Sequence, residues 1–393
     1  MGNKPSHHYE PVKEEETVFV STETEVYRIP SLFYDRDRQI LMAFAEKRRT
    51  SNDASAVALV MRTGQLNKDE TTHEVTVTWS DLKLVKEAHL EGYRPMNPCP
   101  VYEKTSKTLF LFFICVEGTV SECWQIFWGC NKARLCYITT NDGGQSWSAV
   151  TDLTDKLDEI QSWATFAVGP GHGLQTEAGR LIVPMYAYYP CSPTCLFYCC
   201  TPYALYLFSD DQGKTWQFSN RLQKISLECE MAEVSDDTGL KSIYCNARSK
   251  GGYRVEALDK NIGADFITLP PTDKLVETGG GCQGSVVSFP VQSEDAHADG
   301  DPSKNPNKWL LFTHPSDKSK RTDLGVYLNK LPSDPNGWSK PWIINHGPSA
   351  YSDLAYIGDG WFVCLMECGV KEITERIAYK IFSYNEVKQG IGE

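Results

Sequence analysis

The chain has 393 residues, 11% of them aromatic, and a formal net charge of −12 at pH 7. The acidic residues are scattered and no basic cluster offsets them, which argues against nucleic acid as a partner and leaves no polybasic patch for anionic lipid. The expected partner is therefore a small molecule. The length is compatible with a single all-β domain, because such domains stay undivided at larger sizes than most folds.

Residues 1–16 form a polar, acidic head that we expect to be mobile. Residues 1–11 contain no apolar stretch of the kind that a secretory signal needs, so the sequence predicts a protein that is not secreted and whose 14 Cys are reduced. The same head fits the pattern for N-myristoylation, with Gly2 as the acceptor and Ser6 at the sixth position.

From residue 17 onward, short segments rich in β-branched and aromatic residues alternate with Gly, Pro, Asn and Asp clusters. No sustained helical period competes with them, apart from a short helix near 153–160. The longest apolar run, 109–116, is a buried strand that is too short to span a bilayer. We therefore predict one all-β domain over 17–386 and a C-terminal tail at 387–393. The predicted strands include 31–35, 40–46, 56–62, 75–79, 109–116, 181–187, 203–208, 243–247, 285–289, 309–313, 324–328 and 361–366.

An eight-residue pattern occurs twice, as TNDGGQSW at 140–147 and as SDDQGKTW at 209–216, and a degenerate third copy covers 259–266. Its Asp can accept hydrogen bonds from backbone N–H groups, its Gly can take a positive φ, and its Trp can pack beneath the turn. Such turns at fixed intervals are typical of radial repetition, so the sequence predicts a β-propeller.

Two insertions interrupt the strands. Residues 292–308 are rich in Ser, Asp, Pro and Asn, which predicts a mobile loop. Residues 190–202 are aromatic and Cys-rich; this composition fits either a zinc site or a surface that meets something apolar. Because no His accompanies the thiols, we expect neither a metal nor another cofactor. The thiols are Cys191, Cys195, Cys199 and Cys200.

Three arginines, Arg28, Arg248 and Arg321, stand at the ends of predicted strands. Each one alone fits an ordinary surface cation. In a propeller, however, strand ends converge on the central channel, where three guanidinium groups would form a cage for a carboxylate through charge-assisted, partly bidentate hydrogen bonds. The sequence therefore predicts a carboxylate-binding site.

Several further segments match one known family as a set. With the repeated turn, which resembles the Asp box, they make the chain similar to the animal sialidases over roughly residues 18–385, apart from the two insertions. Residues 113–116 and 367–369 are most similar to the ganglioside sialidase of the vertebrate plasma membrane. The matching segments are YRIP at 27–30, AFAEKR at 43–48, MNPCP at 96–100, TFAVGPGH at 165–172, GCQGS at 281–285 and YSDL at 351–354.

The resemblance implies a six-bladed propeller and a retaining exo-α-sialidase, a glycoside hydrolase with a Tyr nucleophile. By position, Tyr351 would be the nucleophile, Glu228 the base that takes its proton, and Asp53 the acid/base. Sialic acid carries a carboxylate on its reacting carbon, so a neutral phenol avoids the repulsion that an Asp or Glu nucleophile would meet. The implied substrate-binding residues are Arg28, Arg248 and Arg321 for the carboxylate, Glu367 to orient Arg28, and Glu46, Arg48, Asn97, Glu122, Tyr186, Tyr188 and Gln283.

The implied substrates are gangliosides, oligosaccharides and glycoproteins that carry terminal α-linked sialic acid. Two other functions share these features: a non-catalytic propeller that binds sialosides or proteins as a lectin or scaffold, and a trans-sialidase that passes the sugar to another sugar. The lectin would need only the arginine cage. For location, the resemblance implies a peripheral membrane protein of plasma or internal membranes, with the cytoplasm as the alternative. The candidate lipid anchors are Gly2 and the thiols of Cys191, Cys195, Cys199 and Cys200.

Overall fold

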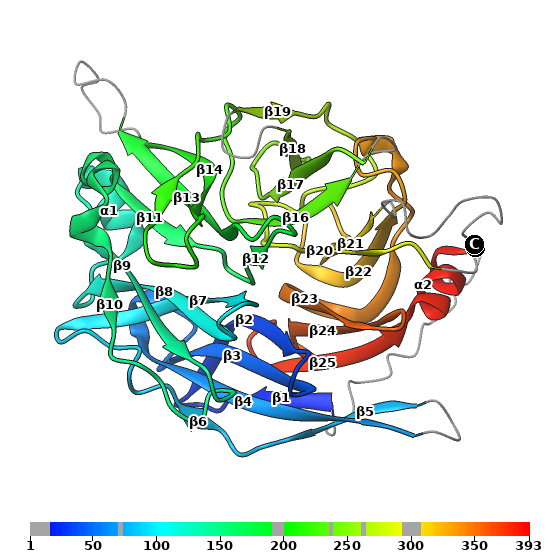
Figure 1. Ribbon diagram of the computed structural model, residues 1–393, viewed down its shortest axis with the longest axis horizontal. Coiled ribbons are helices and arrows are strands. Elements are labelled where there is room, and N and C mark those ends of the chain that lie inside the picture. Colours follow the sequence, from blue (N-terminus) through cyan, green and yellow to red (C-terminus); the bar gives the residue numbers. More distant parts are fainter. Residues whose placement is uncertain (1–15, 70–73, 191–199, 236–238, 261–264, 293–307) are drawn as a thin grey trace, which may run out of the picture.

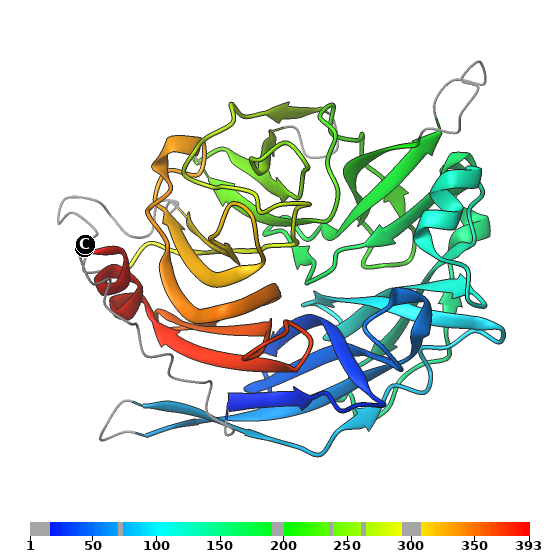
Figure 2. The same ribbon diagram turned by 180° about the vertical axis from the view of Figure 1, so that it is seen from behind.

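The computed structural model shows antiparallel sheets set radially around a central axis, as in a propeller (Figures 1 and 2). The predicted all-β propeller is confirmed. No helix in the part of the chain that the structure covers has both the length and the run of apolar residues that crossing a membrane would take. The structure describes residues 16–69, 74–190, 200–235, 239–260, 265–292 and 308–393.

The sheets follow one another along the chain. The first has the order β2-β3-β4-β5, with β6 paired to β4, and the second has the order β10-β9-β8-β7. These strands are β2 (Val26–Asp35), β3 (Ile40–Arg48), β4 (Ala56–Lys68), β5 (Val75–Trp79), β6 (Lys83–Leu84), β7 (Tyr93–Glu103), β8 (Thr108–Glu117), β9 (Ala133–Thr140) and β10 (Thr151–Asp152).

The third sheet has the order β11-β13-β14-β15, with β12 paired to β13, and the fourth has the order β16-β17-β18-β19. These strands are β11 (Thr165–Val168), β12 (Leu174–Gln175), β13 (Leu181–Pro190), β14 (Cys200–Ser209), β15 (Gln217–Phe218), β16 (Cys229–Ser235), β17 (Lys241–Ala247), β18 (Val255–Asp259) and β19 (Phe266–Thr268).

The last sheet closes the ring, because the N-terminal strand β1 pairs with the C-terminal strand β25, with Thr17 opposite Ala378. Its order is β1-β25-β24-β23-β22-β21-β20. These strands are β1 (Thr17–Val20), β20 (Ser285–Pro290), β21 (Lys308–Pro315), β22 (Thr322–Asn329), β23 (Trp342–Gly358), β24 (Trp361–Cys368) and β25 (Arg376–Ser383).

Every predicted strand lies within an observed one. The strands could be predicted from apolar runs in the sequence. In sheets that pack face to face, both faces of a middle strand are covered, so the sequence of that strand is a continuous apolar run. In β8, for example, only the first and last residues are not buried. Both faces of β8 therefore contribute to the core.

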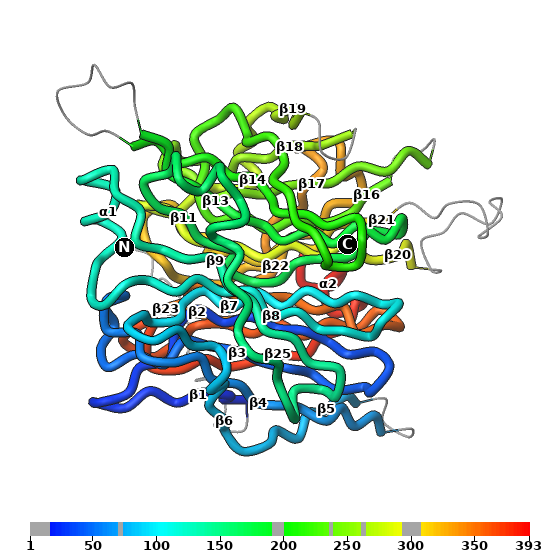
Figure 3. Tube along the Cα trace, turned by 60° about the vertical axis from the view of Figure 1, so that its left-hand side comes forward, coloured from blue at the N-terminus to red at the C-terminus, as the bar shows by residue number. Residues whose placement is uncertain are grey.

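The helices differ from the predictions. The helix expected near 153–160 is replaced by two 3-10 turns, Thr154–Lys156 and Asp158–Ser162, and helix α1 (Glu122–Trp128) was not predicted. The predicted tail at 387–393 is wrong, because most of it belongs to α2 (Tyr384–Ile391), which buries Val387 and Ile391 against the last sheet. Figure 3 shows α1 beside β11 on the outer side of the ring.

The repeated eight-residue turns form as predicted. Asp142 accepts hydrogen bonds from the backbone N–H groups of Gln145 and Ser146 at 2.9 and 3.0 Å, and Asp211 accepts equivalent bonds in the second copy. Trp216 packs edge-on against the Phe112 ring with centroids 4.8 Å apart. The second turn, which joins β14 and β15, is thereby pinned to β8 of the neighbouring sheet. Residues 261–264 of the degenerate third copy lie outside the described residues, as do 1–15, 191–199 and 293–307 of the predicted head and insertions.

Candidate active site

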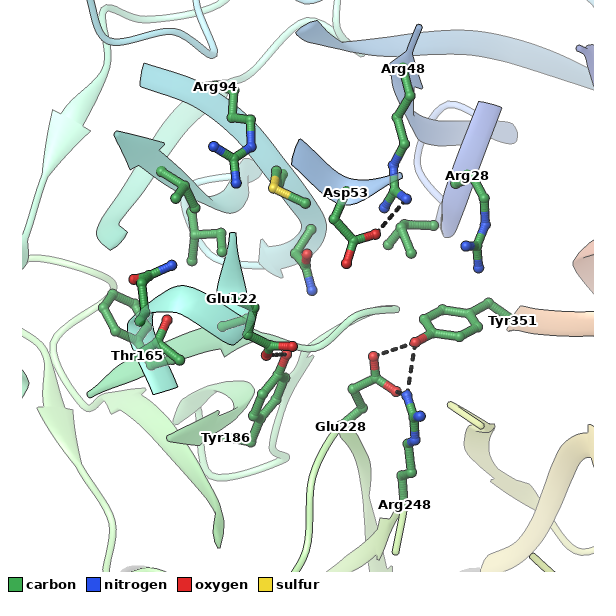
Figure 4. Close-up of a pocket in the computed structure, with 18 of the residues that line it drawn as sticks. Arg28, Arg48, Asp53, Arg94, Glu122, Thr165, Tyr186, Glu228, Arg248 and Tyr351 are labelled. Atoms are coloured by element: carbon green, nitrogen blue, oxygen red, sulfur yellow. Dashed lines mark hydrogen bonds and ion pairs between the residues drawn. The ribbon is translucent and has the colours of Figure 1, made fainter. Parts of the chain in front are cut away.

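A cavity at the centre of the ring gathers most of the predicted site residues (Figure 4). It has a volume of about 290 Å³. Strands from different sheets end around it, so side chains far apart in the sequence meet there, as expected at the axis of a propeller. The predicted residues that line it are Arg28, Arg48, Asp53, Asn97, Glu122, Tyr186, Glu228, Arg248, Arg321 and Tyr351.

Arg28 is fixed by Glu367, a fully buried carboxylate in β24. Nε and Nη2 of Arg28 donate to the two Glu367 oxygens at 2.9 Å each, which makes a bidentate ion pair. The backbone N–H of Ile29, whose φ of 59° is strained for a β-branched residue, donates to the same carboxylate at 2.8 Å. Burial opposes the charge on Arg28, but Glu367 outweighs this effect and raises the pKa of Arg28 overall. The structure thus holds one guanidinium charged and in place before any ligand binds.

Tyr351 and Glu228 form a short hydrogen-bonded pair in the cavity. The Tyr351 hydroxyl donates to Glu228 Oε1 at 2.5 Å, and Arg248 Nη1 donates to Glu228 Oε2 at 2.8 Å and to the Tyr351 oxygen at 3.1 Å (Figure 4). Burial raises the pKa of Tyr351 well above 10, and the Glu228 carboxylate raises it further. The phenol is therefore protonated at neutral pH, with a base in hydrogen-bond reach of its proton.

The three predicted arginines converge on this phenol. Arg248 Nη2 donates to the carbonyl of Gly280 at 3.0 Å and Arg321 Nη2 to that of Gly281 at 2.8 Å, so one loop orients both side chains. The Cζ atoms of Arg28 and Arg321 lie 5.4 and 5.3 Å from the centre of the Tyr351 ring. The structure therefore brings Arg28, Arg248 and Arg321 together, as the predicted cage requires.

Asp53 faces the cavity from a 3-10 turn that follows β3 (Figure 4). Its Oδ1 atom accepts from Arg48 Nη1 at 2.6 Å, and the buried Glu46 holds Arg48 through Nε at 2.7 Å. Glu46 also accepts from the backbone N–H of Asn97 at 2.7 Å. The Asp53 side chain is 57% exposed, so water and a departing group can both reach it.

Glu122, the first residue of α1, provides a third carboxyl group in the cavity, after Glu228 and Asp53. Burial raises its pKa to about 7, with a further contribution from the negative charge of Glu228. The Tyr186 hydroxyl donates to it at 3.1 Å, and the Tyr188 ring packs edge-on against Tyr186 at 6.1 Å. Near neutral pH, Glu122 can therefore exist with or without its proton.

Four predicted residues do not themselves line the cavity: Glu46, Tyr188, Gln283 and Glu367. Gln283 is buried, and its side-chain amide bonds to the backbone of Ser352. Its Oε1 atom accepts from the Ser352 N–H at 3.0 Å, and its Nε2 atom donates to the Ser352 carbonyl at 2.9 Å. Gln283 is thus not part of the cavity wall, and its expected contact with a ligand stays a prediction. Its side chain braces the strand that carries Tyr351.

Sequence reasoning missed several residues of the cavity wall. Arg94 donates through Nη1 to the Gly118 carbonyl at 2.7 Å. Gln125 follows Glu122 at helical spacing and is buried. The family segments could have identified most of them, since Met96 opens MNPCP, Thr165 opens TFAVGPGH, and Arg94 lies two residues before MNPCP. The remaining residues of the wall are Ile29, Met96, Ile114, Val116, Phe166 and Ala167.

Outside the cavity wall, His172 and the fully buried carboxylates Glu230 and Asp353 form a cluster whose ligand atoms all fall within 4.8 Å of one another, with His172 partly exposed. His172 Nδ1 is 2.6 Å from Asp353 Oδ1. The Ser285 hydroxyl bonds to Glu230 and Asp353 at 2.7 and 2.9 Å. Burial, and then the charge of Asp353, raise the pKa of Glu230, which favours one proton shared by the two carboxylates. These atoms could hold a metal ion but are already bonded to one another, and the expectation of no metal stays a prediction.

A radial all-β fold with arginines, a Tyr–Glu pair and an exposed Asp in one central cavity has the parts of a glycoside hydrolase that acts on an acidic sugar. Residues 39–364 match the family described as BNR repeat-like domain. The chain is 43% identical to Sialidase-3 of Homo sapiens over 397 residues, which covers 92% of this chain and 90% of that protein. It is 46% identical to Sialidase-2 of Cricetulus griseus over 367 residues, covering 91% and 92% of the two chains.

Solved structures agree on the fold. The Hadza microbial sialidase Hz136 has a TM-score of 0.72 and 18% identity, over 92% of this chain and 66% of that one. The intramolecular trans-sialidase from Ruminococcus gnavus has a TM-score of 0.67 and 16% identity, over 94% and 96% of the two chains. The chain therefore belongs to the sialidase family and is an enzyme of the glycoside hydrolase class, which confirms the resemblance found in the sequence.

Proposed function

We propose that the protein is a retaining exo-α-sialidase that hydrolyses terminal α-linked sialic acid with Tyr351 as the nucleophile. The observation that carries the proposal is the 2.5 Å hydrogen bond from the Tyr351 hydroxyl to Glu228, in a cavity that also holds three arginines and Asp53. A carboxylate nucleophile would approach the substrate's own carboxylate, whereas a neutral phenol does not add a like charge. The relationship to curated sialidases supports this choice of substrate.

The first half of the reaction forms a glycosyl-enzyme. Arg28, Arg248 and Arg321 bind the sugar carboxylate and place its anomeric carbon next to the Tyr351 oxygen. This oxygen attacks the carbon while Glu228 takes the phenolic proton, and Asp53 gives its proton to the departing oxygen of the aglycone. The single negative charge of the Tyr351–Glu228 pair, which moves from Glu228 to the phenolic oxygen as the proton is transferred, stabilises the positive charge that develops on the ring.

In the second half, Asp53 takes a proton from a water molecule as the water oxygen attacks the same carbon. The bond to Tyr351 breaks, and Glu228 returns the proton to the phenolate. Two displacements on opposite faces restore the starting configuration, which is why the enzyme would be retaining. The exposure of Asp53 supports both of its roles, because first the aglycone and then water must reach it.

The geometry favours an enzyme over a lectin or scaffold, and an assay separates hydrolysis from transfer. A lectin or scaffold needs the arginines but has no use for a base at 2.5 Å from a buried phenol or for an acid opposite it. A trans-sialidase uses the same groups and differs in how well an acceptor sugar competes with water at the intermediate. Adding lactose as an acceptor during the assay separates hydrolysis from transfer.

We also propose that the ring has six blades. The long strand β23 supports this division, because its first part pairs with β22 and its second part with β24, with a register break between Ser349 and Ser352. Divided at this point, the last sheet provides two blades, β20-β21-β22-β23 and β23-β24-β25-β1. The other four sheets provide one blade each.

For substrate and location, we propose sialylated glycolipids and other glycoconjugates, acted on at plasma or internal membranes by a peripherally bound enzyme. The likeness of 113–116 and 367–369 to the ganglioside sialidases supports the glycolipid. The proposed anchors Gly2, Cys191, Cys195 and Cys199 lie outside the described residues. Cys200 is half-buried and its thiol donates to the Ile126 carbonyl at 3.3 Å, so it is less available for acylation than an exposed thiol.

The function can be tested by measuring the release of a fluorogenic aglycone from an α-sialoside between about pH 4 and 7, a range that begins near the ordinary pKa of Asp and Glu. Tyr351→Phe should lower kcat by several orders of magnitude and leave the dissociation constant nearly unchanged, because the arginines stay in place. Tyr206→Phe is the matched control, since its buried hydroxyl also donates to a carboxylate, Asp259, at 2.7 Å, but outside the cavity. A Tyr351→Phe enzyme that is as active as the control would exclude the mechanism.

A further inference from the structure

Helix α1 has two faces with different surroundings. Glu122 and Gln125 line the cavity. Trp124, Phe127 and Trp128, at i, i+3 and i+4 spacing, share the other face and are 41%, 63% and 52% exposed. We call these three side chains the aromatic patch. Large aromatic side chains grouped in this way on a protein surface mark an interaction site.

The helix that carries the aromatic patch is firmly held. Ser121 caps its first turn by accepting from the Trp124 N–H at 3.1 Å, and Gly129 ends it in the left-handed conformation. The buried Gln125 side chain accepts from the Lys132 N–H at 2.8 Å. The rings of the patch contact one another, with the Phe127 and Trp128 centroids 5.0 Å apart and those of Trp124 and Trp128 6.4 Å apart. The rings are thus presented to the outside on a fixed support.

The charge around the aromatic patch indicates what covers it. Residues 123–131 contain no charged side chain, although 23% of the whole chain is charged. A protein or nucleic-acid partner chosen by charge has nothing to pair with here. Tryptophan is instead enriched where a lipid bilayer meets water, because its ring is apolar and its N–H is polar. With a net charge of −12, the protein gains nothing from an anionic membrane, so the matching surface is a neutral, zwitterionic one.

We propose that the aromatic patch Trp124, Phe127 and Trp128 inserts into the headgroup region of a lipid bilayer and turns the cavity toward sugars carried by lipids. Because Glu122 on the same helix lines the cavity, the bilayer surface lies about one helix diameter, roughly 10 Å, from the sugar site. A short glycolipid headgroup can span that distance without leaving the membrane. The glycolipid part of this inference rests on the proposed function; the membrane contact does not.

The test uses the full-length chain made in bacteria, where neither N-myristoylation nor S-palmitoylation contributes. The aromatic patch is removed in one variant, Trp124→Ser, Phe127→Ser and Trp128→Ser. A control variant removes exposed apolar side chains elsewhere: Val20→Ser, Ile267→Ser and Leu331→Ser, which are 60%, 53% and 55% exposed. Each protein is sedimented with vesicles of phosphatidylcholine alone and of phosphatidylcholine with added anionic lipid, at low and high salt. Each is also assayed on a soluble α-sialoside and on a sialylated glycolipid in the phosphatidylcholine vesicles.

We expect the wild type and the control to bind the neutral vesicles with little dependence on salt. The patch variant should lose on the order of tenfold or more of its vesicle partitioning, because three partly buried aromatic rings are removed from the interface. Its kcat/KM on the vesicle-borne glycolipid should fall by a similar factor, with the soluble sialoside cleaved at the wild-type rate.

Three results would overturn the proposal: a patch variant that partitions like the wild type, wild-type binding that requires anionic lipid and is lost in salt, or a wild type that self-associates through the aromatic patch. Vesicle partitioning is measured without turnover. It therefore decides the membrane contact even if the wild type cleaves no sialoside, a result that would count against the proposed function alone.

Discussion

The replacement Glu367→Gln tests whether ligand binding depends on an Arg28 that is oriented in advance. The Glu367 carboxylate accepts from Arg28 Nε and Nη2, from the N–H of Ile29, and from the N–H of Tyr351 at 3.4 Å. An amide has one acceptor oxygen, so Arg28 Nη2 and the Tyr351 N–H would face an NH₂ group. Removing the charge of one partner in a buried ion pair lowers the free energy of unfolding by about 3–5 kcal/mol. Each donor left without an acceptor contributes about 1–3 kcal/mol to this loss.

We expect the free energy of unfolding of Glu367→Gln in urea to fall by about 3–5 kcal/mol. The KM for a soluble α-sialoside should rise roughly 10- to 100-fold, equivalent to about 1.4–2.8 kcal/mol of lost binding. Glu256→Gln is the control, because this buried carboxyl accepts from Tyr244 and Trp338 at 2.6 and 2.8 Å away from the cavity. Both donors bond to the same Glu256 oxygen, which an amide keeps, so the control should keep its KM and most of its stability. If Glu367→Gln also keeps the wild-type KM, Arg28 does not need Glu367 to bind the substrate and the reasoning is refuted.

Three further predictions concern single groups. Arg321→Lys should raise KM strongly with kcat less affected, since a point charge cannot grip two carboxylate oxygens; an unchanged KM in steady-state assays would remove Arg321 from the cage. Glu122 has a pKa of about 7, so it is neutral below that pH and anionic above it, and KM for the anionic substrate should rise above pH 7. In Glu122→Gln this rise should disappear, and its persistence in a pH series would assign it to another group. Asp142→Ala should lower the free energy of unfolding by about 1–2 kcal/mol through lost hydrogen bonds, with KM unchanged. Burial by itself would raise the pKa of Asp142, but the hydrogen bonds from Ser146 outweigh this effect and lower it. The stability that these bonds provide is therefore present above the ordinary Asp pKa and is lost as the pH falls below it. Equal acid sensitivity of mutant and wild type would contradict this.

Local chemistry made the sheets and the repeated turns predictable. An apolar run such as 109–116 can be satisfied only where both faces of a strand are covered, and an Asp followed by Gly and Trp closes the same turn wherever it occurs. Helix α1 was missed because its seven residues are too few to show a sustained helical period. The cap signals were present, since Ser121 precedes it and Gly129 follows it.

Most site residues were predictable only through the family segments, because nothing local in the sequence says that Glu228 meets Tyr351, 123 positions away. The hydrogen-bond partners that the sequence could not indicate are those set by the three-dimensional surroundings. The Gln283 amide bonds to the backbone of Ser352, and the carboxyl of Glu230 is paired with that of Asp353 outside the cavity. Long-range packing decides these outcomes, and spacing along the chain carries no information on it.

The central claim, that Tyr351 becomes covalently bonded to the sugar, can be tested by trapping the intermediate. A sialic acid with fluorine at C2 and C3 should react, because fluoride leaves from C2 while the fluorine at C3 destabilises the positive charge needed for hydrolysis. After proteolysis, mass spectrometry should find the fluorosialyl group on the peptide that contains Tyr351, and Tyr351→Phe should stay unlabelled. A fluorosialyl group on Asp53 or Glu228, or labelling of Tyr351→Phe at the wild-type rate, would contradict the proposed mechanism.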